Sequence, residues 1–209
     1  MSGQMDRTRF LQKAGLGGAA AAFPALLGAE AAFAQAADSQ IALVVAFSEA
    51  PRTSAGVQPR MAINAALTFR PQQRLVAGGG NWVLFDWARP ATPQRMLASG
   101  RLTARQFVNW DTRGLSAVGT VQPGLLDLQA DFEGLQSGVA LRIICNVGPA
   151  GVQTGEPEGY RATTTQYGTF EPLSPSLGIT HTSAPGYTTE VIRHQHHHHH
   201  HHHPRRRGR

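Results

Sequence analysis

Cysteine is almost absent from the sequence: Cys145 is the only one in 209 residues, so no disulfide bond can form within the chain. It ends a short apolar run, a setting that is typical of a small buried hydrophobic side chain. The alternative is a catalytic thiol, which needs a histidine close in space. His181 is the only histidine outside the C-terminal tail and would have to fill that role.

Charged residues make up 15% and aromatic residues 7% of the chain, whereas glycine (23) and proline (13) are frequent. This composition favours short strands joined by many turns over long charged helices. The sequence contains no G-x-S-x-G, no H-E-x-x-H and no paired cysteines. With a single histidine before the tail, we expect no zinc enzyme, because such sites usually use several histidines.

The formal net charge of +6 comes mainly from the C-terminal end. Residues 38–193 hold twelve arginines and eleven acidic residues, a balance of +1, whereas residues 194–209 hold four arginines and no acid. A nearly neutral middle part implies no basic face. We therefore expect no nucleic-acid binding by the folded domain.

Residues 1–37 have the three zones of a bacterial export signal. A positive region with Arg7, Arg9 and Lys13 precedes the uncharged segment 14–29, and A-x-A-like cleavage sites follow. Sixteen uncharged residues are short for a membrane span, which needs about twenty. We expect a cleaved signal peptide, an exported protein in the cell envelope or outside the cell, and no transmembrane span in the mature form.

Residues 6–12 (DRTRFLQ) resemble the twin-arginine export motif. Phe10 and Leu11 occupy the places that the motif gives them, and Arg7 matches its first arginine. Thr8 stands where the motif has its second arginine. The resemblance implies export of an already folded protein, and the general secretory route is the alternative.

From residue 39 onward, apolar residues come in short bursts between turn residues. The pattern predicts strands at 41–47, 62–69, 81–87, 96–110, 125–132, 139–147, 160–165 and 179–182. Segment 62–69 could also be a short helix. The continuous apolar run 41–47 indicates a strand buried on both faces, and the glycine triplet 78–80 indicates a flexible break.

Two of these segments alternate with period two, and 125–132 has the signature of a strand with one wet face. In 125–132 the buried set is Leu126, Leu128, Ala130 and Phe132, and the exposed set is Asp127, Gln129, Asp131 and the following Glu133. This segment and 139–147 form the best hairpin, through a turn at 134–138. In 101–108 one face holds Leu102, Ala104, Gln106 and Val108, and the other holds Arg101, Thr103, Arg105 and Phe107.

These patterns predict an all-β fold in three parts. A signal peptide (1–37) precedes a small β-sandwich or β-barrel (38–193), and a disordered His/Arg-rich tail (194–209) follows. The pattern does not choose between sandwich and barrel.

Three groups of residues are candidates for chemistry. Asp127, Asp131 and Glu133 could bind calcium or act as the acid–base pair of a hydrolase, but a solvated strand face explains them better. The loop 148–159 has four glycines and two prolines and matches no phosphate-binding pattern, so a connecting loop is favoured over a ligand site at Glu156 and Glu158. Tryptophans could line a sugar-binding groove, although core packing is favoured for Trp82, Trp87 and Trp110.

The C-terminal tail carries a nearly continuous run of imidazoles: His194, His196, His197, His198, His199, His200, His201, His202 and His203. Neighbouring imidazoles on a flexible chain can chelate Ni, Zn or Cu together. An engineered tag and a low-complexity tail without a selected metal are the alternatives. The arginines after it could adhere to anionic cell-wall polymer or lipid.

The sequence favours an exported, non-enzymatic β domain that binds or packs at the cell surface, with cell-wall polymer or carbohydrate as candidate partners. A secreted small-barrel hydrolase or isomerase that uses the acidic residues is the first alternative. Metal handling through the tail is the second. The sequence assigns no catalytic residue and no cofactor beyond a metal on the tail.

Overall fold

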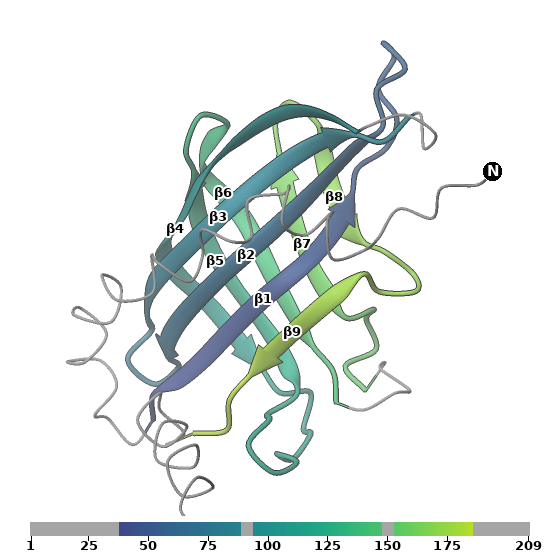
Figure 1. The fold of residues 1–209 in the computed structure, drawn as a ribbon. Helices are drawn as coiled ribbons and strands as arrows, with labels where there is room; N and C mark the ends of the chain where they lie inside the picture. The colour runs from purple at the N-terminus through teal and green to yellow at the C-terminus, as the bar shows by residue number, and fades with distance from the viewer. Residues whose placement is uncertain (1–37, 89–93, 148–152, 186–209) are drawn as a thin grey trace, which may run out of the picture.

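The computed structural model describes residues 38–88, 94–147 and 153–185 (Figure 1). They form nine strands: β1 (Gln40–Glu49), β2 (Pro59–Arg70), β3 (Leu75–Asp86), β4 (Arg95–Asp111), β5 (Gly124–Phe132), β6 (Gln136–Cys145), β7 (Gly159–Thr164), β8 (Gly168–Pro172) and β9 (Gly178–Thr182). Strands are the only regular elements in these ranges, which confirms the all-β prediction for them. A helix long and apolar enough to cross a membrane is not found in the described part of the chain.

The strands close into an antiparallel barrel. From β1 to β8 each strand pairs with the next along the chain, and β8 returns to pair with β1. Eight strands thus form the closed barrel, and β9 is an extra strand beside β1. Of the two architectures that the sequence left open, the barrel is correct. Closure removes the open sheet edges that a sandwich would retain.

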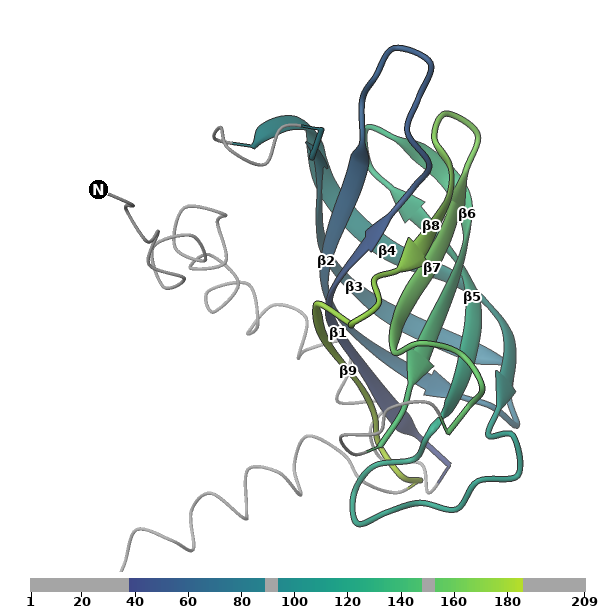
Figure 2. The same ribbon diagram turned by 90° about the vertical axis from the view of Figure 1, so that its right-hand side faces the viewer.

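Strand β1 closes the barrel in two halves. Its last residues, Ser48 and Glu49, pair with β8, whereas residues 42–46 pair with β9 (Figures 1 and 2). The other side of β9 reaches the end of β6: the Thr180 hydroxyl donates a 2.5 Å hydrogen bond to the carbonyl oxygen of Ile144. Strand β9 therefore completes the wall where the short strand β8 does not extend.

The interior is apolar because successive side chains alternate between the two faces of each strand. In β5 this alternation buries Leu126 and Leu128 and leaves Asp127 and Gln129 on the outside, as predicted. An eight-stranded barrel has an interior just wide enough for side chains to fill. Large side chains occupy it here, among them Trp82, Tyr160, Phe69, Phe132, Phe170 and Met61.

The prediction that β1 is buried on both faces is wrong. Ala42 and Val44 point into the core, but Leu43 and Val45 are 38% and 47% exposed on the outside. A continuous apolar run cannot reveal this difference because both of its faces look alike. Ile179 of β9 lies opposite Val45 in the strand pairing and is also exposed, so the outer surface carries an apolar strip here.

The glycine triplet 78–80 is part of β3, so the predicted flexible break is also wrong. The neighbouring backbones come too close for a side chain at this point. A Cβ atom on Gly80 would lie 2.0 Å from the carbonyl oxygen of Asn64, and one on Gly79 would lie 2.1 Å from that of Leu102. The glycines are required for close strand contact, not for a turn.

Two β-bulges in strand β4 change which of its side chains point into the barrel. The register shifts between Ala104 and Gln106 and again between Phe107 and Asn109. As a result Phe107 is 5% exposed and Val108 is 40% exposed, the reverse of the predicted alternation. An extra residue in a bulge moves the side chains that follow it to the opposite face, and the second bulge restores the original alternation, so Trp110 packs against the core.

Candidate functional site

The carboxylates predicted on the wet face of β5 lie there, and both aspartates pair with arginines. Arg142 holds Asp127 with two hydrogen bonds, from Nε to Oδ1 (2.6 Å) and from Nη2 to Oδ2 (3.1 Å). Arg105 donates from Nε to Oδ2 of Asp131 at 2.6 Å. Glu133 comes just after the strand. A solvated strand face is therefore the right description, with the added fact that its aspartates are paired.

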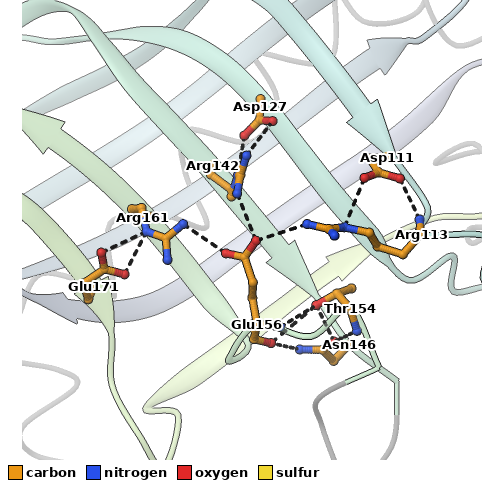
Figure 3. Close-up of polar contacts among 9 residues, drawn as sticks. All are labelled: Asp111, Arg113, Asp127, Arg142, Asn146, Thr154, Glu156, Arg161 and Glu171. Atoms are coloured by element: carbon orange, nitrogen blue, oxygen red, sulfur yellow. Dashed lines mark hydrogen bonds and ion pairs between the residues drawn. The ribbon is translucent and has the colours of Figure 1, made fainter.

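Glu156 is the centre of a network of ion pairs on the outside of the barrel (Figure 3). Its carboxylate accepts a hydrogen bond from Arg142 at 2.9 Å and another from Arg161 at 3.0 Å, and Arg113 lies 3.6 Å away. Arg161 also holds Glu171 through its Nε atom at 2.8 Å. The predicted loop glutamate is thus brought to the strand face, where it binds arginines of the same chain.

Hydrogen bonds with the Asn146 side chain fix the segment that carries Glu156. The Thr154 amide and hydroxyl both donate to the side-chain oxygen of Asn146 at 2.9 Å. The Asn146 side-chain nitrogen in turn donates to the carbonyl oxygen of Glu156 at 2.9 Å. Because Thr154 and Asn146 are both buried, the segment 153–158 is anchored to the end of β6. Its observed role is that of a connecting loop.

The electrostatics of this surface do not favour acid–base catalysis. Hydrogen bonds from the Gly138 amide and Arg105 lower the pKa of Asp131, whereas a general acid needs a raised pKa. The hydrogen bond to Asp127 raises the pKa of Arg142, so the guanidinium stays ionised. Within the described ranges, no group of three or more His, Cys, Asp or Glu side chains is arranged to hold a metal ion.

An open depression of about 640 Å³ lies on the outer surface, further along β5 than this network. Its floor is the outer face of β4 and β5, and its wall is the turn between β5 and β6. The polar side chains that line it are Arg101, Thr103, Arg105, Asp131, Glu133, Gln136 and Ser137. Asp131 lies four residues after Asp127 on β5, so the depression is about 13 Å along the strand from the ion-pair network.

The depression is rich in uncommitted donors. In the described part of the chain, the Arg101 guanidinium has no hydrogen-bond or ion-pair partner, although its backbone amide donates to Glu133 at 3.4 Å. Arg105 uses only Nε for Asp131. Gln136 accepts hydrogen bonds from Thr165 through its oxygen, which leaves its amide nitrogen available. A ligand with acceptor oxygens would find several donors here.

The tryptophans do not form one groove. Trp82 is 1% exposed inside the barrel, and Trp110 packs against Phe69 with ring centroids 5.1 Å apart. Trp87 is half-buried and is covered by the Arg60 guanidinium at 4.2 Å from its ring centroid. The predicted packing is confirmed for Trp82 and Trp110.

Cys145 is a buried side chain, as predicted. It is 0% exposed, and burial raises the pKa of its thiol. Its sulfur contacts the backbone of β9, accepting from the Thr182 amide at 3.3 Å. His181 stands opposite Leu43 in the pairing of β9 with β1, and Leu43 is on the outer face. The thiol and the imidazole therefore point to different sides of the wall, which does not suit a catalytic pair.

Two further predictions lie outside the described residues. The export signal falls on residues 1–37, and the histidine tract falls on residues 194–203. Both remain predictions from the sequence.

The sequence predicts the acidic residues of this surface but not the arginines that pair with them. The pattern puts Arg101 and Arg105 on one strand face but does not connect them with Asp131. The signal was present, because the alternation in 101–108 puts both arginines on the face opposite Leu102 and Ala104. What the sequence could not supply is the register that sets Thr103 opposite Asp131.

Comparison of the chain with protein-family models, with curated proteins and with solved structures gives no significant match. The assignment of function therefore depends on the geometry of the barrel and its outer surface.

Proposed function

We propose that this protein is an exported, non-catalytic binding module that holds its ligand on the charged outer surface of β4, β5 and β6. The observation that carries the proposal is the depression beside Arg101, where donors without partners meet an open surface. The packed interior supports it as well, because core side chains occupy the space in which other barrels of this size bind a small ligand. Export is supported by the three-zone leader.

The outer surface of β4, β5 and β6 has the charge balance of a polar recognition surface. Asp127, Asp131 and Glu156 are each paired with arginines of the same chain, so the surface is polar without a large net charge. Such a surface suits a polar, hydroxyl-rich partner such as a cell-wall polymer or another carbohydrate. The alternative of a secreted hydrolase would need a carboxyl group with a raised pKa, whereas the pKa of Asp131 is lowered.

Affinity electrophoresis of the full-length chain in gels that contain a series of acidic and neutral polysaccharides tests this function. We expect at least one polysaccharide to retard the protein, and the doubly substituted variant R101Q/R105Q to migrate freely in the same gel. R95Q is the matched control, because Arg95 is on the same strand but outside the depression. Retardation that is unchanged in R101Q/R105Q would contradict the proposed site. New reducing ends in the gel would contradict a non-catalytic role.

Metal handling is a second candidate function, carried by the histidine tract of the tail. Calorimetric titration of the full chain with nickel should show binding, and a variant in which His196 to His203 are all alanine should lose it. Equal nickel binding by the variant would rule out the tail as the metal site.

A further inference from the structure

We infer that the ligand of the depression is a glycan that carries uronic-acid carboxylates, an inference that rests on the proposed function. The chemistry of the lining is the starting point. Arg101 and Arg105 are two exposed guanidinium groups on the outer face of β4, with Thr103 between them. A guanidinium group is the side chain best suited to hold a carboxylate, because its planar N–H groups match the two oxygens.

The two arginines differ in their contacts within the described part of the chain. Arg105 is held in place by Asp131, whereas the Arg101 guanidinium has no partner. The Nε atom of Arg105 donates to Asp131 at 2.6 Å, and the Arg105 side chain is 60% exposed, so its two terminal nitrogens are left for a ligand. Arg101 has no partner for its guanidinium in the described part of the chain. Ordering a carboxylate against Arg101 would therefore not require breaking an existing ion pair.

The acids of the depression argue against a more highly charged ligand. Asp131 and Glu133 stand beside the two arginines, so the four charged side chains of the lining sum to zero. A phosphate monoester would bring about −1.5 to −2 charges on one group against these carboxylates, and the repulsion would weaken its binding. A uronate brings a single negative charge on each ring, together with hydroxyl groups that carry none.

Hydroxyl groups find partners in the same depression. The Glu133 carboxylate is exposed and can accept from a sugar hydroxyl, and the Thr103 hydroxyl and the Gln136 amide nitrogen can donate to one. Leu135, a half-buried apolar side chain of the wall, offers a surface to the C–H groups of a sugar ring. A sugar acid can use hydrogen-bond acceptors, hydrogen-bond donors and an apolar contact in the same site. A small anion without a sugar ring would use only the donors.

The open shape indicates a chain ligand and not a small enclosed molecule. Arg101 and Arg105 are four residues apart, which corresponds to roughly 13 Å along an extended strand. A linear oligosaccharide lying along β4 could bring a different carboxylate near each of them. The depression is open to solvent beside the β5–β6 turn, so a longer polymer could extend beyond it.

Isothermal titration of the full-length chain with linear trigalacturonate, with EDTA present to keep metal off the tail, tests the inference. We expect saturable binding that weakens at least 10-fold in R101Q and in R105Q and is unchanged in R95Q. The methyl ester of the same trisaccharide, which lacks the negative charges, should bind at least 10-fold more weakly. A variant with glutamine at Arg205, Arg206, Arg207 and Arg209 should bind like the parent, because the tail is not the site.

The possible failures are distinguishable. If the methyl ester or neutral trigalactose binds as tightly as trigalacturonate, and R101Q still weakens it, the uronate inference is wrong while the proposed binding function stands. If sodium acetate alone competes at the same concentration of carboxylate, the site takes a bare oxyanion and the glycan inference is wrong. If R101Q and R105Q bind every sugar like the parent, the proposed site itself is wrong.

Discussion

Across the interior of the barrel, the hydroxyl group of Tyr160 donates a 2.6 Å hydrogen bond to the carbonyl oxygen of Met61. Tyr160 belongs to β7 and Met61 to β2, strands that are not neighbours in the sheet. Burial raises the pKa of Tyr160, so the hydroxyl stays protonated and remains a donor. This hydrogen bond joins two separated parts of the wall through the core, next to the place where only two residues of β1 pair with β8.

Replacing Tyr160 by phenylalanine should lower the free energy of unfolding by about 1 kcal/mol, because the ring is kept and one buried hydrogen bond is lost. Urea-induced unfolding followed by circular dichroism measures the change. Y167F is the matched control, since the Tyr167 hydroxyl only accepts a hydrogen bond from the exposed Gln166. An equal loss of unfolding free energy in both variants would mean that the hydrogen bond to Met61 does not contribute measurably to stability.

Removing the charge of Glu156 should destabilise the fold more than removing the charge of Glu171. The Glu156 side chain is 16% exposed and serves two arginines by hydrogen bonds, whereas the Glu171 side chain is 53% exposed and serves one. We expect E156Q to lose about 1 to 2 kcal/mol and E171Q less than about 0.5 kcal/mol in the same urea experiment. Similar losses would show that solvent screens both sites equally.

A methyl group at Gly80 should be poorly tolerated although the backbone there is ordinary strand. The added Cβ would lie 2.0 Å from the carbonyl oxygen of Asn64, so β2 and β3 would have to move apart. We expect G80A to lose about 2 to 3 kcal/mol of stability. The control is N81A, at an exposed position of the same strand. Unchanged stability of G80A would indicate a looser contact between the two strands.

The thiol of Cys145 should react slowly in the folded protein. Burial raises its pKa, so the reactive thiolate forms only at a pH above the ordinary range for cysteine, and the wall also excludes the reagent. Ellman's reagent should modify the native chain far more slowly than the urea-unfolded chain at pH 8. Equal rates in the two states would show that the junction of β6 and β9 opens readily.

The sequence predicts strands correctly where side chains alternate between apolar and polar. It does not predict which face a residue takes where that face depends on pairing with a neighbouring strand. Leu126 and Asp127 were placed on the correct faces because period-two alternation is a local property. The exposure of Val45, the strand role of Gly80 and the inward turn of Phe107 all depend on contacts with neighbouring strands.

Strand β8 was missed for the same reason. It has five residues and alternates only weakly, and its place is fixed by its pairing with β7 and β1. The candidate site was likewise predictable only in part, because strand pairing determines the rest. Its carboxylates were visible as one wet face, whereas the Arg101 and Arg105 partners became evident only once the register of β4 against β5 was known.

Chemical-shift mapping by NMR of the labelled full-length chain during titration with trigalacturonate locates the ligand most directly. Binding on the outer surface should shift the side-chain N–H signals of Arg101 and Arg105 and the backbone amide of Gln136. The indole N–H signal of Trp82, which is buried inside the barrel, should stay in place. A shift of the Trp82 signal without a change at either arginine would place the ligand inside the barrel and contradict an outer binding surface.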